Sequence, residues 1–391
     1  MKTRSPVKKR LLVFHIECTQ LRGGEKYIYE LVKRVSPRVP TELFIENISP
    51  YWRSQYNKLH VSVHLLWKPK HLYWPLLPIT LGINYVLLQR YLSQNDTVFV
   101  TNFPLSFLTT LLSKKTILFC FEPLSVFYDS FRIKQSGIRE RFLLAVIKFF
   151  YAPLDRLAIR RATMVATLNK EVDNAMYSLY KKRANFYIPN GVDTSHFSPK
   201  KRPLYKKRGG YIIGHSTDYS PLKGTEVLLR ATPQIIRAHP NARIYISESM
   251  NNKHTKQKYI NLIKTLHMQK YVFFIGCIPE NQLPNFYASC DVFCYTGSTQ
   301  CVGGSSASLS VLEAQSCGIP VLRTVGNSDE IIPNKTGLYF TSEEPKHIAD
   351  TINSFLSLST RQTKTMGRAA RAHCVQNFSW SVSSKQLLRH A

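Results

Sequence analysis

Short apolar runs alternate with amphipathic segments along most of this chain of 391 residues. The short runs are typical of buried strands, and the helically spaced apolar residues between them are typical of packed helices. In the first half, strands are predicted at 10–17, 41–47, 61–67, 96–102, 115–122 and 163–169. Helices are predicted there at 23–35 and 139–162.

The pattern breaks at residues 188–210, which are rich in Pro, Gly and charge, and then restarts. In the second half, strands are predicted at 210–216, 242–248, 271–276, 291–297 and 319–324. Helices are predicted there at 223–238, 258–267, 280–290 and 308–317. Strands that alternate with helices predict parallel sheets covered on both faces. We therefore expect an α/β protein of two Rossmann-like, doubly wound domains, with the ligand in the cleft between them.

Length and charge are compatible with this picture. A chain of 391 residues suits two domains better than one core. Lys and Arg total 53 against 24 acidic residues, a net charge of +29, and both halves are basic. Such a charge predicts a polyanionic partner, which could be nucleic acid, an anionic membrane or a phosphorylated substrate. The chain lacks interleaved aromatic and basic motifs, so we expect no nucleic-acid partner.

Cysteines and termini indicate a cytoplasmic protein. The eight cysteines form no C-x-x-C pair and lie mostly in apolar segments, so buried free thiols in a reducing compartment are expected. The basic start has a short apolar part and no small-residue cleavage site, which argues against a signal peptide. The most apolar stretch, 71–92, contains two prolines. We interpret it as a buried helix or an interfacial contact instead of a membrane span.

Five motifs of the second half carry a family resemblance. They are "IPNGVDTSHFSP", "LKGTEVLLRA", "SCDVFCYTGS", "LSVLEAQSCGIPVL" and "GNSDEIIPNKTGLYF", in that order. Near the N-terminus, "RGGEKYIYELVKRV" matches a glycine-rich loop and first helix of the same family. In order and spacing, the chain resembles the family 4 retaining glycosyltransferases of the GT-B fold.

The resemblance implies a domain order. Residues 1–190 would form an acceptor-side domain, 191–210 a linker and 211–375 the nucleotide-sugar domain, with 376–391 as a helix crossing back to the first domain. It implies metal-independent transfer of a sugar from a UDP- or GDP-sugar, without a cofactor. The acceptor would be a glycan or a lipid-linked hydroxyl, as in the synthesis of cell-envelope polysaccharides.

Two glycine-containing loops are candidate phosphate sites. Gly23 and Gly24 lie between a predicted strand and a helix, where a backbone without side chains can approach an anion closely. Lys223 and Gly224 precede a second helix, so a cation and a helix start come together. The resemblance assigns Lys223 and Gly224 to the donor phosphates, and Gly23 and Gly24 to a loop that meets the donor diphosphate or the acceptor. The alternatives are a tight turn at Gly23 and Gly24, and a solvated surface side chain at Lys223.

Glu313 is the one acid in the segment 305–322. An ionised carboxylate only accepts hydrogen bonds and so suits a diol; in the resembling family this carboxylate binds the nucleotide ribose. Ser308 is a plausible N-cap of its helix, whose first N–H groups could bind phosphate or sugar oxygens. The resemblance also implies donor contacts for Leu309, Gly326 and Glu330. The alternative for Glu313 is a solvated helix-face residue.

Several sugar-facing positions depart from the family pattern. The first of two family glutamates is replaced by Ser305, and Phe121 stands where the family often has His before Glu122 and Pro123. No Arg lies just upstream of Lys223. We keep Ser305 and Glu122 as candidate catalytic residues and Phe121 as an acceptor-side residue. A non-catalytic relative that binds sugar nucleotides or glycans remains the alternative.

Basic clusters next to aromatic residues suggest an anionic membrane surface as a further partner, contacted peripherally from the cytoplasmic face. These clusters are Lys8–Arg10, Lys68 and Lys70 beside Tyr73 and Trp74, and Lys200–Arg208.

Overall fold

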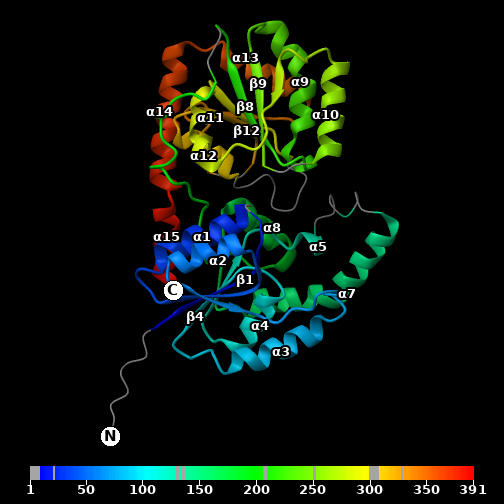
Figure 1. The fold of residues 1–391 in the computed structure, drawn as a ribbon, viewed down its shortest axis with the longest axis vertical. Helices are drawn as coiled ribbons and strands as arrows, with labels where there is room; N and C mark the ends of the chain where they lie inside the picture. The colour runs from blue at the N-terminus through cyan, green and yellow to red at the C-terminus, as the bar shows by residue number, and fades with distance from the viewer. Residues whose placement is uncertain are drawn as a thin grey trace. The chain divides into compact units, whose positions relative to one another are not determined.

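The chain forms two compact units in a computed structural model, shown as a ribbon in Figure 1. The structure describes residues 9–20, 23–128, 133, 137–205, 209–249, 252–298, 308–326 and 329–391. The first unit comprises Met1–Asn190 and Trp380–Ala391, and the second comprises Gly191–Ser379.

The first unit is built on a parallel sheet of seven strands in the order β3-β2-β1-β4-β5-β6-β7. Its strands are β1 (Leu11–Cys18), β2 (Thr41–Ile48), β3 (Ser62–Leu65), β4 (Thr97–Val100), β5 (Thr116–Cys120), β6 (Met164–Thr167) and β7 (Phe186–Tyr187). Its helices are α1 (Gly23–Val35), α2 (Pro50–Lys58), α3 (Leu77–Gln89), α4 (Leu105–Leu112), α5 (Ser125–Tyr128), α7 (Ile138–Arg161), α8 (Lys170–Tyr180) and α15 (Trp380–His390).

Helices cover both faces of this sheet. Helix α1 packs against α15, and α4 packs against α3 and α7, with strands β1 and β4 between the two groups in Figure 1. Tyr27 of α1 is fully buried, and its ring lies 5.5 Å from that of Trp380. Its hydroxyl donates to the Ile188 carbonyl at 2.8 Å. The last helix of the chain is therefore part of the core of the first unit.

The second unit has a parallel sheet of six strands in the order β10-β9-β8-β11-β12-β13. Its strands are β8 (Ile212–Thr217), β9 (Arg243–Glu248), β10 (Val272–Phe274), β11 (Val292–Tyr295), β12 (Val321–Thr324) and β13 (Gly337–Phe340). Its helices are α9 (Thr225–Ala238), α10 (Lys253–Thr265), α11 (Leu283–Ser289), α12 (Leu309–Ser316), α13 (Pro345–Leu356) and α14 (Thr360–Asn377), with short 3-10 turns at Pro221–Lys223 and Glu280–Gln282.

Two apolar layers enclose the second sheet. One layer includes Leu228 of α9, Tyr259 of α10 and Ile348 of α13. The other includes Leu312 of α12 and Cys374 of α14. In Figure 1, α9 and α10 lie on one side of the sheet and α11, α12 and α14 on the other. The predicted α/β class with two doubly wound parallel sheets is confirmed.

The structure differs from the sequence prediction in two segments. Of the two interpretations of the apolar stretch 71–92, a buried helix or an interfacial contact, the first is excluded and the second stays open, because Ile79, Val86 and Leu87 of α3 are exposed. The segment 191–210, expected to form a linker, is part of the second unit. Its Val192 N–H donates to the Phe378 carbonyl at 2.8 Å. Among the described helices, none is long and apolar enough to cross a bilayer.

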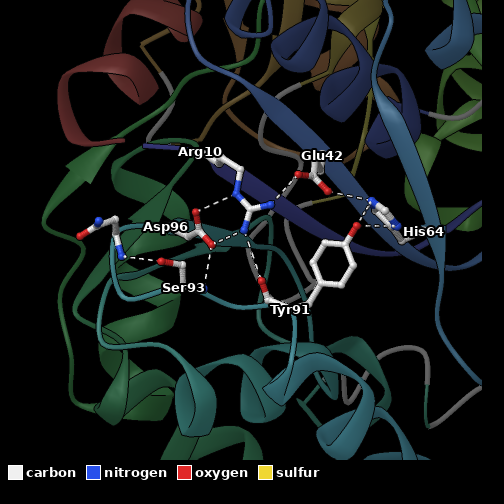
Figure 2. A network of polar contacts seen from close by, with 7 residues as sticks. Arg10, Glu42, His64, Tyr91, Ser93 and Asp96 are labelled. Carbon is white, nitrogen blue, oxygen red and sulfur yellow. Dashed lines mark hydrogen bonds and ion pairs between the residues drawn. The ribbon is translucent and has the colours of Figure 1, made fainter. Parts of the chain in front are cut away.

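A polar network ties the amino ends of the first sheet together (Figure 2). The Arg10 guanidinium donates to both Asp96 carboxylate oxygens, at 3.0 and 2.7 Å, and to Glu42 at 2.9 Å. Glu42 in turn lies 2.8 Å from Nε2 of His64. Arg10 thus links the starts of β1, β2 and β4. This member of the predicted lipid-binding clusters therefore has a structural role.

Candidate functional site

The strand order of the second unit marks one place for a ligand. From β8 the chain moves outward to β9 and β10, and it then returns to β11 on the other side of β8. Ligands of open α/β sheets bind in the crevice outside the carboxyl ends of the strands, where the order reverses. The residues that follow β8 and β11 therefore line the expected site.

The loop that contains Gly224 is hydrogen-bonded to the residues that follow β11. Gly224 has φ +62°, and an added Cβ would lie 1.7 Å from the Thr296 carbonyl oxygen, so only glycine fits. The Thr296 hydroxyl donates to the Gly224 carbonyl at 2.9 Å, and the Ser298 N–H donates to the Leu222 carbonyl at 2.9 Å. The start of α9 is thereby held against the end of β11.

A buried chain of hydrogen bonds also holds the start of α9. His215 is fully buried, and burial lowers its pKa to about 4, so its imidazole is neutral at pH 7. Its Nδ1 lies 2.9 Å from the Cys294 carbonyl, which can only accept, so Nδ1 carries the hydrogen. Nε2 then accepts from the Thr225 hydroxyl at 3.0 Å. Thr225 Oγ1 also lies 2.8 Å from Thr217 Oγ1.

Lys223 places a positive charge at this helix start. It is half-buried, and its Nζ lies 5.5 Å from the centre of the Tyr295 ring. The neighbouring Tyr295 and Asp218 raise the pKa of Lys223 against the opposing effect of burial, so the side chain is cationic at neutral pH. Among the residues that the structure describes, no side chain caps α9. A cation next to uncapped helical N–H groups is the arrangement that binds phosphate.

A second cation lies beside the same aromatic ring. Arg323 of β12 is fully buried, with its guanidinium carbon 5.8 Å from the Tyr295 ring centre. It forms an ion pair with Glu330, which is also buried. Glu330, one of the predicted donor-binding residues, is therefore connected to the Lys223 site through Arg323 and Tyr295.

Glu313 lies on α12, the helix that connects β11 to β12. Only 7% of it is exposed, and the Tyr287 hydroxyl donates to its carboxylate at 2.8 Å. It is therefore a buried, oriented carboxylate, which excludes the alternative of a solvated helix-face residue. Ser308 is the N-cap of this helix but makes no capping hydrogen bond, and Leu309 is its first residue. Gly326 follows the end of β12, and Ser305 lies outside the described residues.

Candidate residues of the first unit lie at the carboxyl edge of their own sheet. Gly23 and Gly24 open α1 just after β1, and Phe121 and Glu122 follow β5. A Cβ at Gly24 would meet nothing within 4 Å, so that position is open toward an incoming group. The Phe121 ring packs edge-on against Tyr27 at 5.0 Å. The structure thus joins the α1 loop to the Phe121 strand end, while Glu122 is exposed.

Glu46, near the carboxyl end of β2, is a buried acid that the motif analysis did not identify. The Tyr73 hydroxyl lies 2.9 Å from each of its carboxylate oxygens. Burial raises the pKa of Glu46 to about 7, although Tyr73 and Lys68 act in the opposite direction and Glu17 adds to the rise.

This pKa predicts a pH-dependent stability. In the folded protein the pKa of Glu46 is about 7, above the ordinary glutamate value of 4.5 that applies to the unfolded chain. Burial of Glu46 therefore does not reduce the free energy of unfolding below pH 4.5. That free energy decreases as the pH rises to about 7, and the contribution of Glu46 is constant above that pH. The loss is about 3 kcal/mol. Urea denaturation should show that Glu46→Gln removes this part of the loss, whereas exposed Glu344→Gln does not. An unchanged pH profile in Glu46→Gln would contradict the assignment.

A surface hollow of about 710 Å³ lies elsewhere on the second unit, lined by residues that include Asn334, Lys335, Arg361 and Met366. Asn334 and Lys335 precede β13, so this hollow is at the amino end of the strands. Open α/β sheets bind ligands at the opposite edge. We therefore do not assign it to the donor.

A comparison with protein families identifies most of the second unit. Residues 197–373 match the model of the family described as glycosyl transferases group 1. This match contains both Lys223 and Glu313. The segment 197–373 belongs to the glycosyl transferases group 1 family. The resemblance found in the motifs is thus confirmed for the second unit.

Curated relatives of this group 1 domain include two actinobacterial enzymes. One is the GDP-mannose-dependent monoacylated alpha-(1-6)-phosphatidylinositol monomannoside mannosyltransferase of Corynebacterium glutamicum, 27% identical over 51% of this chain and 54% of that protein. The other is the GDP-mannose-dependent alpha-(1-6)-phosphatidylinositol monomannoside mannosyltransferase of Mycolicibacterium smegmatis, 27% identical over 60% of this chain and 64% of that protein. The matches thus span between about half and two thirds of these relatives.

Solved structures extend the likeness to the whole chain. The Anabaena protein Alr3699/HepE in complex with UDP has a TM-score of 0.72 at 16% identity, covering 97% of this chain and 98% of that one. WaaG, a glycosyltransferase involved in lipopolysaccharide biosynthesis, has a TM-score of 0.69 at 14% identity, covering 96% and 98%. At these identities the likeness concerns the fold, which is GT-B.

Four residues of the site were missed by sequence reasoning. They are His215, Tyr287, Tyr295 and Arg323. Arg323 offered a signal, because a charge within the apolar run "IPVLRT" must find a buried partner or distort the strand. Tyr287 offered none, because its partner Glu313 is 26 residues away along the chain.

Proposed function

We propose that the protein is a glycosyltransferase that moves a sugar, with retention, from a UDP- or GDP-sugar to a hydroxyl of a lipid-linked or glycan acceptor. The observation that carries the proposal is the cationic, uncapped start of α9, held between β8 and β11. The group 1 family match and the GDP-mannose-dependent relatives support a nucleotide-sugar donor.

The second unit would hold the donor. Lys223 and the first N–H groups of α9 would bind the diphosphate, and the N–H groups after Ser308 would add to them. Glu313, already oriented by Tyr287, would accept hydrogen bonds from the ribose hydroxyls. Ser305 would face the sugar and Gly326 would allow close approach of the donor to the strand end.

The chemistry requires little from acid–base groups. The bond between the anomeric carbon and the diphosphate oxygen breaks, and the acceptor oxygen bonds to the same face of the sugar. The acceptor proton passes to the departing diphosphate. The protein then has to position both reactants and stabilise the separating charges, which Lys223 and the α9 start are able to do.

The first unit would bind the acceptor. Gly23, Gly24 and Glu122 lie at the carboxyl edge of its sheet, where such sheets bind ligands. Phe121 offers an apolar surface there and cannot donate a hydrogen bond or a proton. We propose a lipid-linked acceptor, met at the cytoplasmic face of an anionic membrane, because the named relatives act on phosphatidylinositol mannosides.

Glu313→Gln tests the donor site. It should weaken the binding of GDP or UDP by the value of a charge-assisted hydrogen bond, about 1.5–3 kcal/mol, measured by calorimetry. Ser305→Ala should leave the affinity for the bare nucleotide nearly unchanged and should reduce transfer from GDP-mannose or UDP-glucose. Tyr287→Phe is the matched control, since it removes the Tyr287 hydroxyl and keeps the charge of Glu313.

Three outcomes separate the alternatives. Transfer that falls in Ser305→Ala supports the enzyme. Tight nucleotide binding without hydrolysis or transfer of any tested nucleotide sugar would instead support the non-catalytic relative. Equal nucleotide affinity in the parent and in Glu313→Gln would show that Glu313 does not contact the ribose.

A further inference from the structure

Helix α7 exposes an unusual amount of apolar surface. Phe142 is 73%, Phe149 76% and Phe150 62% exposed. Four more apolar side chains of this helix are exposed as well: Ile138, Leu143, Val146 and Leu157. Single exposed apolar residues are ordinary, but contiguous apolar patches on a protein surface mark interaction sites.

These seven side chains share one face. At about 100° per residue they fall within an arc of about 140°. The buried residues of the helix, which include Ile147, Ala158 and Ile159, lie on the opposite face. Helix α7 is therefore apolar on both sides, with one side packed against the first unit and the other facing outward.

Positive charge accompanies the outward face. The helix carries six exposed basic side chains: Arg139, Arg141, Lys148, Arg156, Arg160 and Arg161. At about 100° per residue, all but Arg141 and Lys148 fall within the same arc as the exposed apolar side chains. It has two acidic residues, and of these Asp155 is buried and accepts a hydrogen bond from Tyr180 at 2.9 Å. An outward helix face of this composition matches helices that lie in the interface of an anionic bilayer.

We infer that α7 docks the first unit on an anionic lipid surface, with the phenylalanines in the acyl boundary and the basic side chains at the headgroups. A second copy of the chain is the competing occupant. It would bring the four arginines of this face against four like charges, whereas anionic headgroups neutralise them. This inference rests on the membrane association proposed above and names the surface that makes it, but it does not require sugar transfer.

The test uses the full chain and vesicles of phosphatidylglycerol and phosphatidylethanolamine. The triple variant Phe142→Ser, Phe149→Ser, Phe150→Ser should lose at least about tenfold in vesicle partitioning while remaining folded, because these side chains are exposed. Tryptophan fluorescence checks that the first unit remains folded, since all four tryptophans belong to that unit. The matched control is Ile79→Ser, Val86→Ser, Leu87→Ser on α3, which also exposes apolar residues but has no charged residue.

Retained vesicle binding in the α7 triple variant would overturn the inference, as would an equal loss in the α3 control. A wild-type dimer that becomes monomeric in the α7 variant, with vesicle binding unchanged, would assign the face to a second copy. Nucleotide affinity is measured alongside. Failure to bind any nucleotide with vesicle binding intact would contradict the proposed transferase and leave α7 as a lipid-docking helix.

Discussion

Replacing Arg323 by alanine is expected to lower the free energy of unfolding of the second unit by about 3–5 kcal/mol. Arg323 is fully buried, and its partner Glu330 is 3% exposed. Removing the guanidinium leaves a carboxylate without its cation where water cannot reach it. Such an uncompensated buried charge costs more than the ion pair itself contributes.

The control removes both charges. Arg323→Met combined with Glu330→Gln should recover most of the lost stability, since a neutral pair leaves no charge to solvate. Urea denaturation followed by circular dichroism measures the effect, because tryptophan fluorescence reports only on the first unit. If the single variant is no less stable than exposed Arg230→Ala, or if the double variant recovers nothing, the buried pair is not as described.

Lys223→Ala is expected to weaken the binding of GDP or UDP by about 10- to 100-fold, the equivalent of one charge-assisted contact to the diphosphate. Lys223 directly precedes the start of α9, which no side chain of the described residues caps, and its ammonium lies 5.5 Å from the Tyr295 ring centre. Stability should change little, since Lys223 is half-buried and its nearest aromatic neighbour, Tyr295, stays in place.

Lys335→Ala is the matched control for Lys223→Ala. Lys335 also belongs to the second unit and lines the hollow at the opposite end of the strands. Calorimetric titration with GDP and with UDP compares the two variants with the parent. An equal loss in both variants would mean that only overall charge matters, and an unchanged Lys223→Ala would remove the diphosphate assignment.

Much of the fold could be predicted because its signals are local. Apolar runs such as that of β1 mark strands buried on both faces, and Gly224 before a helix marks a sharp turn. The place of Lys223 just before one helix and of Glu313 on another followed from that alternation. The same signals place α7 as a helix, but they give no indication that one apolar face remains uncovered.

The remainder depends on contacts between distant parts of the chain. His215 is held by Cys294, 79 residues away, and Glu313 by Tyr287, 26 residues away. Neither pair has a sequence spacing that could reveal it. Arg10 shows the reverse case, since its place in a basic cluster suggested a membrane contact while its actual partners are Asp96 and Glu42.

Hydrogen exchange with and without GDP or UDP tests the central claim most directly, because it maps where the nucleotide binds on the intact chain. The account predicts slower exchange of amides over 217–229, from the end of β8 into α9, and over 308–316 of α12. Amides over 354–369, beside the hollow at the amino ends of the strands, should be unaffected. Protection confined to 354–369, or no protection at saturating nucleotide, would contradict a donor site at the carboxyl ends of β8 and β11.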